Sequence, residues 1–71
     1  MRHLYPRIVS EPGILYGKPV IEGTRLSVEA LHQNLASGYS RDDLLDAYPF
    51  LTPDDITAAI EYAARLAANP P

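Results

Sequence analysis

The sequence predicts a mainly α-helical fold. We expect a short, basic N-terminal β-hairpin arm over residues 1–26, followed by a three-helix, helix-turn-helix-like (homeodomain-like) bundle over residues 27–71, together forming a single domain. Two observations predict this division. Six prolines and glycines interrupt the first 26 residues, too densely for a helix. Beyond them, three segments each begin with a helix-capping residue and carry apolar side chains at helical spacing.

Short apolar pieces lie between the breaks of the arm. Residues 8–9, 14–16, 20–21 and 26 predict short strands, with a turn over residues 22–24. Pro19 has no amide proton, so it predicts an edge strand or the start of one. We expect the terminus around His3 to be mobile and the arm to have little of the chain to pack against.

Three helices of about ten, eight and 16 residues are expected after the arm. Ser27, Ser40 and Thr52 are their predicted N-caps, while Gly38 and Pro49 end the first two. Aspartates in the first turns of the second and third helices suit capping and the helix dipole, which argues against a metal or acid–base role for them. On the first helix one face carries Val28, Leu31, His32 and Leu35.

Composition argues against most catalytic classes. The chain has no cysteine and two histidines, so neither a disulfide nor an ordinary zinc site is expected. The segment from Gly13 to Pro19 departs from a phosphate-binding loop, which needs four residues between its glycines and Ser or Thr after the lysine. We therefore expect a non-enzymatic protein without metal, cofactor or small-molecule substrate. Without a membrane span or a signal-peptide pattern, the expected location is the cytoplasm.

A chain of 71 residues without cysteine has a small core, which favours a partner chain. The third helix is rich in alanine, and small side chains permit a close approach of helices. The tyrosines of the arm offer amphipathic contact area. With the predicted edge strand, these features favour a homodimer.

Charge is divided along the chain. Residues 1–25 contain four basic and two acidic side chains, and the remainder contains two basic and seven acidic ones. The start of the third helix carries Asp54 and Asp55, which DNA phosphates would repel. Contact with operator DNA, if the chain makes it, is therefore expected from the arm, through Arg2, Arg7, Lys18 and Arg25.

Three segments of the sequence carry a family resemblance. They are residues 17–25 (GKPVIEGTR), 38–40 (GYS) and 48–56 (YPFLTPDDI). With them the chain resembles the bacterial DUF433 family from Ile8 to Ala67, although the family often has proline at the position of Ser27. The resemblance implies a small helix-turn-helix-like domain regarded as a VapB-type antitoxin, often encoded beside a PIN-like ribonuclease. It supplies no catalytic residues.

PIN-type nucleases gather acidic residues around Mg²⁺, and antitoxins of this class cover that site or insert an arginine. The resemblance therefore implies binding and neutralisation of a PIN-like toxin, with a small DNA-binding autoregulator as the alternative function. Arg25, beside Gly23 on the predicted turn, is the first candidate for the inserted charge. An internal bond from Arg25 to a carbonyl or to Asp42 remains the alternative. The predicted partner-binding residues are Arg25, Lys18, Arg7 and Tyr16.

Overall fold

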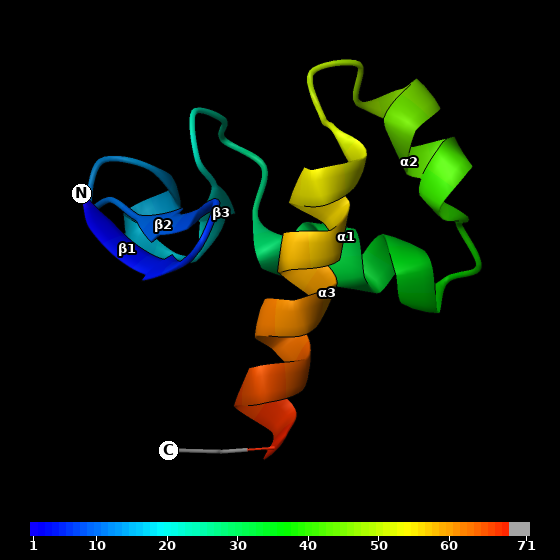
Figure 1. Cartoon of the computed structure of the whole chain (residues 1–71). Coiled ribbons are helices and arrows are strands. Elements are labelled where there is room, and N and C mark those ends of the chain that lie inside the picture. The colour runs from blue at the N-terminus through cyan, green and yellow to red at the C-terminus, as the bar shows by residue number, and fades with distance from the viewer. Residues whose placement is uncertain (69–71) are drawn as a thin grey trace.

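In the computed structural model, which describes residues 1–68, a small sheet is followed by three helices (Figure 1). The predicted order of a β-containing arm and then helices is confirmed. The elements are strands β1 (Arg2–Tyr5), β2 (Ile8–Ser10) and β3 (Val20–Ile21), the 3₁₀ turn η1 (Leu15–Gly17), and helices α1 (Val28–Ala36), α2 (Arg41–Ala47) and α3 (Pro53–Ala68).

The sheet is antiparallel, with the strand order β1-β2-β3. Strand β1 was not expected, because its polar first residues, Arg2 and His3, show no apolar alternation. It forms because the chain reverses at Arg7, which has a φ of 71°, and lays His3 opposite Val9. The terminus that we expected to be mobile is therefore one of the two outer strands of the sheet.

The turn expected over residues 22–24 is present. The Ile21 amide donates to the Leu26 carbonyl (3.0 Å), and the Thr24 hydroxyl donates to the Ile21 carbonyl (2.8 Å). Residues 25–26 do not form a strand of their own, since the returning segment adds only a bridge between Val20 and Ser27. The main strand partner of β3 is β2.

The strand expected at residues 14–16 is wrong, because this segment holds η1. The Gly17 amide donates to the Ile14 carbonyl (3.1 Å), and the Ser10 hydroxyl donates to the Gly17 carbonyl (2.6 Å). Leu15 and Tyr16 both have left-handed backbone angles, with φ of 49° and 58°. Local turn hydrogen bonds thus override the apolar pattern that predicted a strand.

The core joins the arm to the helices. Ile8 and Ile21 are fully buried and belong to one apolar cluster with Leu31, Leu44 and Ile56. The expectation that the arm has little to pack against is therefore wrong. Its short strands place two isoleucines in the same buried cluster as residues of the three helices, and a chain of this size gains much of its stability from such burial.

Local capping chemistry places the helices where the sequence predicts them. The Ser27 hydroxyl accepts a hydrogen bond from the Ala30 amide (3.0 Å), and Gly38 follows α1 with a φ of 103°. Of the predicted face of α1, Val28 and Leu31 are buried, whereas His32 is exposed. No helix within residues 1–68 combines the length and apolar character needed to cross a membrane.

Candidate partner-binding site

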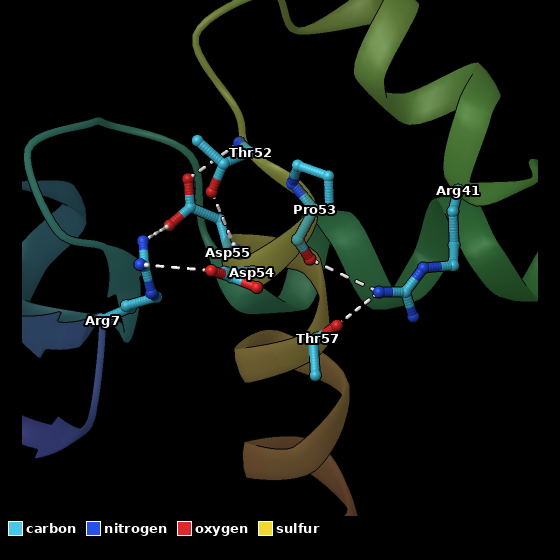
Figure 2. A network of polar contacts seen from close by, with 7 residues as sticks. All are labelled: Arg7, Arg41, Thr52, Pro53, Asp54, Asp55 and Thr57. Atoms are coloured by element: carbon cyan, nitrogen blue, oxygen red, sulfur yellow. Dashed lines mark hydrogen bonds and ion pairs between the residues drawn. The ribbon is translucent and has the colours of Figure 1, made fainter.

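The start of α3 is held by a polar network that reaches into the arm (Figure 2). The Asp55 amide donates to the Thr52 hydroxyl (3.3 Å), and the Thr52 amide donates to the Asp55 carboxylate (3.0 Å). Arg7 forms an ion pair with the buried Asp55 at 3.0 Å and approaches the exposed Asp54 at 3.6 Å. One carboxylate thus caps the helix and ties the arm to it.

A second arginine holds the same turn from the opposite side. The Arg41 guanidinium, from α2, donates to the Pro53 carbonyl (3.3 Å) and to the Thr57 hydroxyl (Figure 2). The side chain of Asp54 remains 79% exposed. The first turn of α3 is therefore bonded within the chain from two sides, by Arg7 and by Arg41.

Strand β1 is attached to the middle of α3 by aromatic contacts. The Tyr5 hydroxyl donates to the Glu61 carboxylate (3.1 Å), and the Tyr5 ring lies 6.3 Å from the Tyr62 ring. The Arg65 guanidinium lies over the Tyr5 ring, 5.3 Å from its centroid. Tyr5 is one of the arm tyrosines that we expected to contact a partner. In the structure it makes contacts within the chain.

The predicted site residues lie in different environments. Arg7 is engaged in the network at α3, and Lys18 forms an exposed ion pair with Glu29 at 3.7 Å, of a kind that contributes little stability. Arg2 and Arg25 are exposed, and their side chains make no hydrogen bond or ion pair within residues 1–68. Tyr16 is 100% exposed on η1.

Arg25 lines a shallow hollow formed where two loops meet. The hollow has a volume of about 460 Å³ and is lined by Gly23, Thr24, Arg25, Leu26, Tyr48 and Phe50. The Thr24 hydroxyl fixes the first loop, since it donates to the Ile21 carbonyl and accepts a hydrogen bond from the Leu26 amide. The alternative bond from Arg25 to Asp42 is not formed among the described residues. Arg25 is therefore held on a structured turn with its charge uncompensated.

Phe50 and Tyr48 form the other wall of the hollow. Phe50 is 56% exposed and packs edge-on against Tyr48, with ring centroids 6.0 Å apart. The Asn34 side-chain amide donates to the Tyr48 hydroxyl (3.3 Å), which fixes that ring. Sequence reasoning did not select Phe50, although an aromatic residue between Pro49 and a helix cap was an available signal. We name Arg25, Tyr48 and Phe50 the arginine–aromatic surface.

The chemistry of this surface suits binding. Arg25 can donate hydrogen bonds bidentately to a carboxylate, and an exposed aromatic ring can anchor in an apolar recess. Within residues 1–68, no three or more His, Cys, Asp or Glu side chains lie close enough together to hold a metal ion.

Comparison with known proteins places the chain in a family. Residues 8–63 match the family model described as a protein of unknown function, DUF433. The chain belongs to the DUF433 family. The predicted resemblance is thereby confirmed. The two loops of the hollow both lie within the matched residues.

The chain is also similar to a curated protein and to a solved structure. The uncharacterized protein y4eO of Sinorhizobium fredii (strain NBRC 101917 / NGR234) is 40% identical over 63 residues, which cover 89% of this chain and 27% of that protein. The crystal structure of a DUF433 member protein from Anabaena variabilis is similar with a TM-score of 0.78 and 34% identity, covering 90% of this chain and 60% of the other. The chain thus spans about a quarter of one relative and three fifths of the other.

Proposed function

We propose that this DUF433 chain is a non-enzymatic, antitoxin-like subunit that binds and neutralises a PIN-like ribonuclease through its arginine–aromatic surface. The observation that carries the proposal is the position of Arg25. It stands on a hydrogen-bonded turn beside an exposed aromatic ring, and no carboxylate within residues 1–68 pairs with it. The identity of the partner class comes from the family resemblance.

An arginine in this setting suits an acidic partner site. The guanidinium is always charged, and its planar fork matches the geometry of carboxylates. Because Thr24 already fixes the turn, less conformational entropy is lost when Arg25 docks. Phe50 adds apolar contact next to the charge, and this combination of Arg and aromatic side chains is typical of binding hot spots.

DNA binding is the less favoured function. Of the four cations proposed for DNA, Arg7 is bound to Asp55 and Lys18 lies beside Glu29. The pair α2 and α3, which would form the helix-turn-helix, begins its second helix with the acidic Asp54 and Asp55. A regulator that uses the arm would therefore depend on Arg2 and Arg25 together.

The experiment co-expresses the chain with the product of the neighbouring gene, where the family resemblance implies a PIN-like ribonuclease. Co-purification and inhibition of ribonuclease activity are measured for the natural chain, for Arg25→Gln and for Phe50→Ala. We expect each substitution to weaken inhibition at least about tenfold. Arg2→Gln is the matched control, since Arg2 is also exposed and lacks a partner within residues 1–68.

Two results would overturn the proposal. One is the absence of a complex at micromolar concentration with the natural chain. The other is equal inhibition by the Arg25→Gln and natural chains. Salt-dependent promoter binding that falls equally with Arg2→Gln and Arg25→Gln would support the DNA-binding function in its place.

A further inference from the structure

An apolar hollow lies on the described surface between α1 and α3. It is a groove of about 470 Å³ lined by Leu31, His32, Leu35, Ala36, Ile56, Ala59, Ile60, Ala63, Ala64 and Ala67. A neighbouring hollow shares His32, Ala63 and Ala67 with it and adds Leu66. Ile60 and Leu66 are 39% and 48% exposed, so large apolar side chains stand at this surface.

The exposure of Leu66 follows from the length of α3. Leu66 follows Ala59 at the i+7 spacing, which places it on the face that α3 turns toward the core. Ala59 is buried on that face, whereas the last turns of α3 extend beyond α1 and the sheet (Figure 1). The apolar stripe of α3 is therefore longer than the core that covers it.

We propose that this groove is the contact surface between two copies of the chain. In the dimer, the second half of α3 from each copy lies antiparallel to that of the other, and the helices cross near Ala63 and Ala64. Small side chains at the crossing permit close approach of the two helices. Ile60 and Leu66 of each copy then enter the apolar surface of the other, which makes the contact self-complementary, as a two-fold axis requires.

The distribution of charge permits contact between two copies at this face and disfavours it over most of the remaining surface. The chain carries a net charge of −3, so two copies repel each other over most orientations. None of the groove residues is Asp, Glu, Lys or Arg. The exposed Asp42, Asp43 and Asp54 lie at the starts of α2 and α3, outside the lining of both hollows. The second hollow adds one acidic residue, Glu29, which forms an ion pair with Lys18 at 3.7 Å, so two acidic copies meet with little repulsion at this face.

The size of the surface fits a small dimer. The two hollows together present about 16 residues, approaching the roughly 20–30 residues that each side of a standard protein interface contributes. The surface also carries the apolar character expected of homodimer interfaces. The arginine–aromatic surface shares no lining residue with it, so a dimer can present two such surfaces.

The test measures the mass of the chain alone by light scattering at about 100 μM, a concentration that populates dimers with micromolar Kd. We expect the mass of a dimer for the natural chain. Ala64→Glu and Ala64→Lys each place like charges opposite each other at the two-fold axis and are expected to give monomers. An equimolar mixture of the two variants pairs opposite charges there and is expected to restore the dimer.

Ala47→Glu is the matched control, because Ala47 is an exposed alanine on α2 that lines neither hollow. It is expected to remain dimeric. A monomeric natural chain would overturn the proposal, and so would dimers of both Ala64 variants on their own. Circular dichroism of each variant shows whether it remains folded. Because no ribonuclease or DNA is present, the result is independent of the proposed antitoxin function.

Discussion

The starts of α2 and α3 use the same local chemistry in two different settings. At α2, the Asp43 amide donates to the Ser40 hydroxyl (3.0 Å) and the Ser40 amide donates to the Asp43 carboxylate (2.9 Å). Thr52 and Asp55 form the corresponding pair of bonds at α3. The first pair is exposed, whereas Asp55 is buried and also binds Arg7.

This difference separates the local role of a capping box from its role in the tertiary structure. An exposed capping box accepts hydrogen bonds from helix amides that could otherwise bond to water. It therefore adds only a modest local stabilisation. At α3 the same carboxylate holds the arm against the helices through a residue 48 positions away. A capping motif with a buried acid can thus connect distant parts of a chain.

The largest effect is expected from Asp55→Ala. The substitution removes the acceptor of the Thr52 amide and the ionic partner of Arg7 in one step. We expect a loss of about 3 kcal/mol in the free energy of unfolding, since a buried charged hydrogen-bonding group is removed. Asp43→Ala, the equivalent change at α2, is expected to reduce it by about 1 kcal/mol. Urea denaturation of both variants measures the difference.

A double-mutant cycle with Arg7→Gln tests whether the arm causes that difference. Arg7 is partly exposed, so we expect its substitution alone to reduce the stability by about 1 kcal/mol. In the Asp55→Ala background, Arg7→Gln should change the stability little, because the ion pair is already absent. Additive effects of the two substitutions would contradict the proposed link between arm and helix.

A smaller effect is expected from Ser40→Ala. This substitution removes the hydroxyl that accepts the Asp43 amide, and the exposed turn leaves that amide free to bond with water. We expect a loss of about 1 kcal/mol or less, with faster hydrogen exchange confined to the first turn of α2. Faster exchange in the arm as well would contradict a local role for this capping box.

The sequence predicts features that depend on residues close together in the chain. Ser27, Ser40 and Thr52 cap helices because each bonds to an amide three residues ahead. The link from Arg7 to Asp55 could not be predicted in this way, because Arg7 was equally consistent with a role in binding DNA or a partner. Strand β1 was missed for the same reason, since its pairing depends on the left-handed turn at Arg7.

At the candidate site, too, contacts between residues far apart in the chain could not be predicted from the sequence. Arg25 could be selected from the sequence, because its position after Gly23 and Thr24 predicts a turn that displays it. Its neighbours Tyr48 and Phe50 come from another loop, and only the packed core brings the two loops together. Local chemistry therefore predicts which side chain is displayed, whereas the tertiary structure determines what surrounds it.

The turn η1 is the opposite case to the capping boxes, because its residue type does not suit its conformation. A tyrosine occupies a backbone conformation that favours glycine. Tyr16 adopts left-handed backbone angles (φ 58°, ψ 31°) that glycine adopts readily and residues with a Cβ rarely adopt. We expect Tyr16→Gly to raise the Tm by about 3 °C, since the relief of strain exceeds the added entropy of the unfolded chain. Tyr16→Ala, measured alongside by calorimetry, removes the ring but keeps the Cβ and should give no rise.

The ring of Tyr16 makes this last comparison informative about function. It is fully exposed, so neither substitution removes packing within the chain. If Tyr16 contacts the partner, as predicted from the sequence, both variants bind the ribonuclease more weakly, although only Tyr16→Gly is more stable. Stability and binding would then change in opposite directions at one residue, as expected where strain is retained for function. Unchanged binding by both variants would remove Tyr16 from the partner surface and leave its strain without a functional explanation.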